Sequence, residues 1–176
     1  RSARAGLKAA DRAFLLGAGV RGPAGLGLGL GVKLIESEIG EYRASTVALD
    51  LGARAELSSP RGPLRLAFAA KNLGPGLKYL GQRDPLPASL SVGLAQGFGR
   101  TMTVSLDANY HLPESRASFG MGTEFTPLGF LSLRAGVLRA ESGGAGPAEL
   151  GGVGAFAGGF GLKLSRFSVD YSFTPL

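Results

Sequence analysis

Residues 25–34 read Gly-Leu-Gly-Leu-Gly-Leu-Gly-Val-Lys-Leu. In an extended strand, successive side chains point to opposite faces of the sheet. One face of this stretch is therefore continuous hydrocarbon, from Leu26 to Leu34 in steps of two, whereas the other carries only glycine and Lys33. The stretch predicts a β-strand with one fully apolar face.

The same alternation recurs along the rest of the chain. Most of the segments are close to the roughly 9–11 residues with which a tilted strand crosses a bilayer, about twice the length of an ordinary strand. The predicted strands are 12–20, 25–35, 46–57, 63–72, 88–96, 101–110, 117–126, 130–139, 154–164 and 167–173.

Between residues 25 and 137, and again from 154 to 173, the charged residues of these segments fall on the face opposite the apolar one. A charge at the bilayer midplane of a transmembrane barrel costs roughly 2–4 kcal/mol on the lipid side, which would explain the exclusion. The polar residues that we expect to face the interior of a barrel are Lys33, Asp50, Arg54, Glu56, Arg65, Lys71, Asp107, Glu124, Arg134, Lys163 and Asp170.

A soluble sheet protein also alternates, with its apolar face on a dry core and its charges in water. The long strands, the unbroken apolar face and the many glycines and alanines on the polar face favour a membrane instead. Lipid cannot satisfy an open sheet edge, so a spanning sheet must close. The sequence therefore predicts an all-β fold, an antiparallel transmembrane β-barrel over residues 12–176, preceded by a loop or remnant segment over residues 1–11. The interior glycines either permit curvature or leave space for a ligand.

The connections between the predicted strands alternate in length. In outer-membrane barrels the short turns face the periplasm and the long loops face the exterior. Both ends of the predicted sheet then lie outside, so we expect this chain to lack at least one strand at each end and to be part of a larger barrel. The short connections are 21–24, 58–62, 97–100, 127–129 and 165–166, and the long ones are 36–45, 73–87, 111–116 and 140–153.

Composition limits the alternatives further. The 176 residues suit one domain, and 30 glycines, ten prolines and no cysteine disfavour a helical bundle or a disulfide scaffold. The net charge of +6 indicates a polyanionic neighbour, either nucleic acid or anionic lipid head groups. Because the cations are spread singly and are not interleaved with aromatic residues, we expect lipid and lipopolysaccharide as the surroundings and no nucleic acid.

The sequence offers little that points to catalysis. Gly17, Gly19 and Gly22 match a dinucleotide fingerprint in letters only, because Pro23 and the Leu/Gly alternation follow where a helix should begin. Asp50, with Arg54 and Glu56, reads as a buried ionic network balanced by Arg65, Lys71 and Arg134 rather than as an acid–base pair. The single histidine, His111, has no cysteine to share a metal with and no evident triad partner. We expect no enzyme, no cofactor and no metal.

Several short pieces of the chain, in order and spacing, resemble the PorV/PorQ family of bacterial outer-membrane proteins. They lie in segments 30–57 and 66–94, in Gly-Thr-Glu-Phe at 122–125 followed by Leu-Arg-Ala-Gly at 133–136, and in the final segments 159–162 and 169–173. The family is similar to the long-chain fatty-acid transporter barrels, which are larger and carry an N-terminal plug. The present sequence lacks such a plug and the expected aromatic-ended final strand.

The resemblance implies a location in the bacterial outer membrane and a transport or channel role for hydrophobic compounds. The alternative is a structural or interaction barrel that anchors a secretion or surface assembly, since the family includes members implicated in type IX secretion. A soluble ligand-binding β-protein is the second alternative.

Overall fold

A computed structural model describes residues 9–140 and 155–174. Its main element is a ten-stranded antiparallel sheet in which neighbours in space are neighbours in sequence order. Each of the ten predicted segments forms a strand of this sheet, because period-two alternation suits only extended backbone. The strands are β1 (Ala9–Arg21), β2 (Gly27–Ile39), β3 (Tyr42–Ser59), β4 (Gly62–Leu73), β7 (Ser89–Phe98), β8 (Met102–His111), β9 (Arg116–Leu128), β10 (Leu131–Ala140), β11 (Ala155–Leu164) and β12 (Phe167–Phe173).

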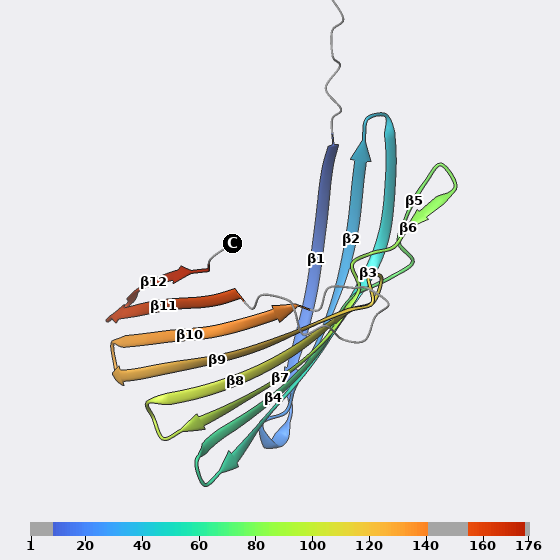
Figure 1. Ribbon diagram of the computed structural model, residues 1–176. Coiled ribbons are helices and arrows are strands. Elements are labelled where there is room, and N and C mark those ends of the chain that lie inside the picture. Colours follow the sequence, from blue (N-terminus) through green and yellow to red (C-terminus); the bar gives the residue numbers. More distant parts are fainter. Residues whose placement is uncertain (1–8, 141–154, 175–176) are drawn as a thin grey trace, which may run out of the picture.

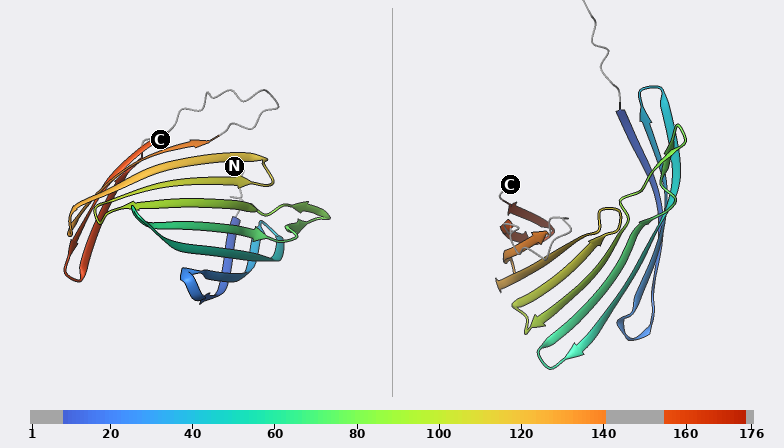
Figure 2. Two further views of the ribbon diagram at one scale, coloured as in Figure 1. Left: turned by 90° about the horizontal axis from the view of Figure 1, so that it is seen from below. Right: turned by 45° about the vertical axis from the view of Figure 1, so that its right-hand side comes forward.

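The sheet is twisted and open. Figures 1 and 2 show β1–β3 running steeply across the direction of β9–β12, with β1 and β12 as the two edges. In the part of the chain that the structure describes, β1 pairs only with β2, and β12 pairs only with β11. The all-β antiparallel fold is thus confirmed, but these strands do not close into a barrel by themselves.

The prediction of a long loop over residues 36–45 is wrong. β2 continues to Ile39 and β3 begins at Tyr42, so that only Gly40 and Glu41 form the turn, with Gly40 at a φ of 62°. Short and long connections therefore do not alternate without exception. The strands were not recognised in this segment because its residues are mostly polar. A polar stretch without alternating apolar residues looks like a loop in the sequence.

Other boundaries shift by smaller amounts. The first strand begins at Ala9, so residues 9–11 belong to the sheet and not to a preceding loop. The predicted connection at 111–116 shrinks to the four-residue turn between β8 and β9. Nearly all of the long connection predicted over residues 140–153 lies outside the described residues.

The connection between β4 and β7 contains a small hairpin that the alternation does not predict. It consists of β5 (Leu77–Tyr79) and β6 (Gln82–Asp84), and β5 contacts β3. A single 3-10 turn, η1 (Pro23–Gly25), links β1 to β2. Among the described residues, no helix is long and apolar enough to cross a membrane.

The sheet has almost no hydrophobic core. Of the described apolar side chains, only those of Ala44, Ala48, Ala70 and Leu86 are buried. By contrast Leu30, Leu66 and Leu133 are 50%, 38% and 45% exposed. No second layer covers the apolar face among the described residues, as a soluble sandwich would require.

Candidate functional site

The register of the sheet places all eleven polar candidates on one face. Opposite partners in an antiparallel ladder share a face, and the pairs Glu56↔Arg65 and Glu124↔Arg134 illustrate this directly. We call this side of the sheet the polar face and the opposite side the apolar face. The polar face carries Lys33, Asp50, Arg54, Glu56, Arg65, Lys71, Asp107, Glu124, Arg134, Lys163 and Asp170.

The most connected charged group on the polar face is centred on Asp50. One carboxylate oxygen lies 2.7 Å from the Lys33 ammonium, and the other accepts the backbone N–H of Asn72 at 2.8 Å. Lys33 also donates to the Asn72 side-chain oxygen at 2.6 Å, and Asn72 donates to the Pro87 carbonyl at 3.0 Å. This network joins β2, β3, β4 and the connection that follows β4.

Asn72 occupies a β-bulge that sequence reasoning missed. The register against β3 slips between Leu49 and Leu51, so that Lys71 and Asn72 together oppose Asp50. Asn72 has a φ of 57°, a conformation that asparagine tolerates better than most residues. Bulges re-aim the chain, and here the strand leaves the sheet immediately afterwards.

Two further ion-pair groups join different strands, and one of them reaches across an intervening strand. Arg65 lies 2.9 Å from Glu56, and Arg134 bridges Glu124 at 2.6 Å and Asp170 at 2.5 Å. The expectation of one buried network around Asp50, Arg54 and Glu56 was therefore wrong. The charges form separate small groups, which are about half exposed outside the Asp50 group, and Arg134 reaches Asp170 across Gly161 of the intervening strand β11.

Four of the polar-face charges remain outside these pairs. Among the described residues, Arg54, Lys71, Asp107 and Lys163 form no ion pair. Asp107 stands between two glycines, because Gly93 and Gly120 are its cross-strand partners on β7 and β9. A Cβ at Gly93 would lie 2.8 Å from the Asp107 carboxylate, so the small neighbour leaves this side chain room.

The connection between β4 and β7 covers one end of the polar face. On β3, Thr46 and Ala48 are buried while their neighbours on the apolar face stay exposed. Leu86 is 5% exposed, and Gly74 passes so close to β3 that an added Cβ would meet the Val47 carbonyl. Thr46 Oγ1 and the Tyr79 hydroxyl are buried here without a hydrogen-bond partner.

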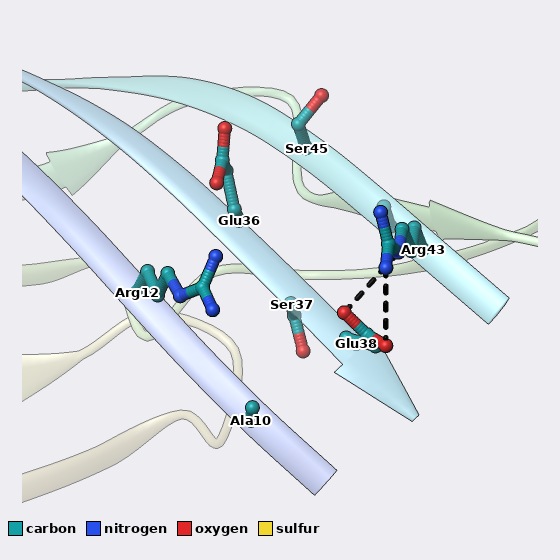
Figure 3. Close-up of a pocket in the computed structure, with 8 residues that line it drawn as sticks. Ala10, Arg12, Glu36, Ser37, Glu38, Arg43 and Ser45 are labelled. Carbon is teal, nitrogen blue, oxygen red and sulfur yellow. Dashed lines mark hydrogen bonds and ion pairs between the residues drawn. The ribbon is translucent and has the colours of Figure 1, made fainter. Parts of the chain in front are cut away.

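A second candidate site lies on the other face, at the end of β1–β3. A cavity of about 280 Å³ is lined mainly by Arg12, Glu36, Glu38, Arg43 and Ser45. Figure 3 shows Arg12 reaching from β1 towards β2, with dashed lines joining Arg43 to Glu38. Arg43 and Glu38 form an ion pair at 3.1 Å. We call this charged group the tip cluster.

The tip cluster continues the apolar face along the same strands. Cross-strand rows read Leu16, Val32, Leu49 and then Phe14, Leu34, Val47. The next row is Arg12, Glu36, Ser45, and the last is Ala10, Glu38, Arg43. The apolar face therefore ends sharply and becomes charged within one row. The sequence analysis placed Glu36, Glu38 and Arg43 in a loop because it ended the strands at residues 35 and 46, and it assigned no face to Arg12 of the predicted strand 12–20.

Away from this end, the apolar face is hollowed. An open hollow of about 810 Å³ spans β4 and β7–β10, and its lining is almost entirely apolar. The larger side chains around it include Leu66, Leu94, Leu106, Phe119 and Met121. Such a surface offers mainly apolar contact, although Asp107 and Arg139 also line it.

In residues 9–140 and 155–174, no three His, Asp or Glu side chains gather as a metal site would require. The glycines of the fingerprint-like segment at 17–22 lie in β1 and the turn after it, not at the start of an α-helix. Neither a protein-family model nor a curated protein sequence matches this chain.

Proposed function

We propose that this chain forms the wall of a bacterial outer-membrane β-barrel that passes hydrophobic compounds. The observation that carries the proposal is the apolar face, which runs across all ten strands and lies exposed. Soluble monomers rarely expose apolar patches beyond a few hundred Å². Lipid is a solvent in which such a face is stable without a second protein layer.

The height of the apolar face matches the thickness of the apolar part of a bilayer. On β3 the apolar row runs without interruption from Val47 to Leu57. Ten residue steps of about 3.3 Å give roughly 33 Å along the strand. At the tilt of about 40° that barrel strands adopt, this length covers about 25 Å of depth, the height of the apolar band of such barrels.

The open edges require other strands. Unpaired backbone groups at β1 and β12 would each cost several kcal/mol in hydrocarbon, so a membrane location needs their ladders completed. The resemblance to the PorV/PorQ family supports the same proposal, because that family builds larger barrels. Transport follows from the similarity of the family to fatty-acid transporters, which is a weaker warrant than a site.

A barrel that anchors a secretion or surface assembly is the second candidate. Cross-strand ion pairs and the β4–β7 connection on the polar face favour it, because both occupy the space through which a compound would pass. Under this proposal the polar face lines the barrel interior, with Arg134 and its two carboxylates on one side and the covered end of β3 on the other.

Reconstitution tests the proposal in two steps. The chain should partition into detergent and float with phospholipid vesicles, and a chain that stays soluble in buffer without detergent contradicts the membrane location. Vesicles holding the inserted protein should then take up a hydrophobic fluorescent probe faster than empty vesicles. Unchanged uptake together with a stably co-purifying protein would favour anchoring.

A further inference from the structure

We propose that the polar face of β1–β3 carries a binding site for a phosphate monoester with an apolar body, held by Arg21 and Arg54. This inference rests on the proposed function, because it names the class of hydrophobic compound that the barrel interior takes. The site lies at the end of these strands where η1 joins β1 to β2, at the bottom of Figure 1. Short turns mark this end, so it would face the periplasm in the proposed barrel.

Arg21 and Arg54 lie in the same cross-strand row of the polar face. Arg21 opposes Gly27 on β2, and Gly27 opposes Arg54 on β3. Two strand spacings, roughly 10 Å, separate the two arginine backbones, and the glycine between them has no side chain. The Arg54 side chain lies across Gly27, since a Cβ added there would meet its Cγ and its Nε at 3.1 Å each. Arg54 therefore extends over β2 towards the strand that carries Arg21.

The charges of this row are not balanced by the protein. In the described residues, neither of the two guanidinium groups forms an ion pair. The carboxylates on the same face of β3 are already engaged, because Asp50 lies 2.7 Å from Lys33. Likewise Glu56 lies 2.9 Å from Arg65. Bringing two guanidinium groups together is unfavourable unless an anion lies between them, and both side chains are exposed to one.

The number of donors selects the chemistry of the anion. Each guanidinium donates two parallel hydrogen bonds to an oxyanion. A carboxylate has two oxygens and a single charge, so it satisfies one such group. A phosphate monoester carries a charge of about −1.5 to −2 at pH 7 and three acceptor oxygens, so it can receive hydrogen bonds from both arginines. The row therefore favours a phosphate monoester over a carboxylate.

The apolar body of the ligand would lie on a floor of glycine beside the arginine row. Gly19, Gly29 and Gly52 form the adjoining row across β1, β2 and β3, and we call them the glycine floor. A Cβ added at any of the three would have only backbone oxygens within 4 Å, so no side chain covers the floor. Glycine within a strand allows another molecule to approach the backbone closely.

Leu15 bounds the far side of the glycine floor. It shares the polar face with Lys33, its partner on β2, and it is 63% exposed. Its side chain lies over Gly31, where an added Cβ would meet the Leu15 Cδ1 at 3.2 Å. Gly31 lies four residues from Gly27 along β2, which is about 13 Å. A phosphate attached to a flat body of two fused rings fits this distance, with the rings on the floor and against Leu15.

Isothermal titration calorimetry of the purified full chain in detergent tests the site. The probes are naphthyl phosphate, naphthoate and inorganic phosphate. Naphthyl phosphate should bind about tenfold more tightly than naphthoate, because only the phosphate engages the second guanidinium. It should also bind about tenfold more tightly than inorganic phosphate, because its rings cover the glycine floor.

Arginine variants test the two guanidinium groups. Arg21→Ala and Arg54→Ala should each weaken the binding of naphthyl phosphate about tenfold and remove its preference over naphthoate. Arg61→Ala, in the β3–β4 turn at the same end of the sheet, is the matched control. Lys163→Ala is a second control, since it removes another polar-face cation that has no ion pair in the described residues. Both controls should bind as the unmodified chain does.

A glycine variant tests the floor separately from the arginines. Gly52→Leu places a side chain where the rings would lie, so it should weaken the binding of naphthyl phosphate about tenfold and leave that of inorganic phosphate unchanged. Gly120→Leu on β9 is the control on the same face, because a Cβ added there would meet no atom closer than 3.8 Å. It should leave the binding of both probes unchanged.

Equal binding of naphthyl phosphate and naphthoate, tighter binding of inorganic phosphate than of naphthyl phosphate, or an arginine variant that binds normally would overturn the inference. Vesicle flotation of the same preparations distinguishes its failure from that of the proposed function. A chain that floats but does not prefer naphthyl phosphate loses only this site. A chain that does not float loses both.

Discussion

Leu106 and Asp107 are adjacent in β8 but belong to two faces that are stabilised in different ways. Leu106 joins a row of apolar side chains that contact no other layer in the described structure. Asp107 joins a face where ion pairs connect strands, as Arg134 on β10 does with Glu124 on β9 and Asp170 on β12. Under the proposed function the apolar face is stabilised by lipid, whereas the polar face is stabilised by ion pairs between strands.

The largest effect should come from a charge placed on the apolar face. Leu106→Arg puts a cation near the middle of the apolar row of β8 and should destabilise the inserted protein by about 2–4 kcal/mol. Ser105→Arg, one residue away on the polar face, is the control and should cost less than about 1 kcal/mol. Urea unfolding of the chain in vesicles measures both. A Leu106→Arg chain as stable as the control would show that this face does not contact lipid.

The next effect should come from the Asp50 network. Asp50→Ala leaves the Lys33 ammonium and the Asn72 backbone N–H without their acceptor, and should cost about 1.5–3 kcal/mol. Asp107→Ala removes a carboxylate from the same face that has no ion-pair partner in the described residues, and should be nearly neutral. Equal losses in the two unfolding curves would mean that the bulge is not held by Asp50.

A smaller effect should come from Gly74, where the chain leaving β4 passes the backbone of β3. A Cβ there would clash with the Val47 carbonyl oxygen, so Gly74→Ala should displace the connection at a cost of about 1–3 kcal/mol. Gly129→Ala in the β9–β10 turn is the control, since nothing lies within 4 Å of its added Cβ. Faster protease cleavage within residues 74–88 of the Gly74→Ala chain would locate the change.

The smallest effect should come from Arg134, because its bridge is about half exposed. Lysine cannot reach both Glu124 and Asp170 with a fork, so Arg134→Lys should cost about 0.5–1 kcal/mol at low salt and less at high salt. Arg166→Lys in the β11–β12 turn should show no salt-dependent difference. A salt-independent loss at Arg134 would indicate a packing role for the guanidinium instead.

The strands and their faces could be predicted from the sequence because alternation at period two is a direct record of side-chain direction. Where the residues on both faces of a strand are polar, the sequence shows no alternation of apolar and polar residues, and the strand cannot be recognised from it. Glu36, Glu38 and Arg43 therefore read as a loop, although they extend the β2–β3 hairpin. The hairpin of β5 and β6 was missed for another reason, since three-residue strands are too short to show a period.

Which side chains form ion pairs was harder to predict than which face of the sheet each side chain lies on. Asp50 meets Lys33 because the β2–β3 register brings their strands together, and register depends on turn length as well as on pattern. The bulge at Asn72 inserts one extra residue into β4, and the alternation of the sequence does not predict this insertion. Whether the sheet closes into a barrel could not be predicted from the sequence either. Alternation reports the direction of side chains within one strand, and it does not report whether the first and last strands of a sheet meet.

The order of the strands has an evolutionary consequence. Every strand of the main sheet adjoins its neighbours in sequence, so the sheet is a meander without crossovers. Duplicating or deleting one hairpin would change the width of the sheet by two strands and leave the face of every other side chain unaltered. A sheet of this design can be widened by gene duplication without a change to any strand already in place.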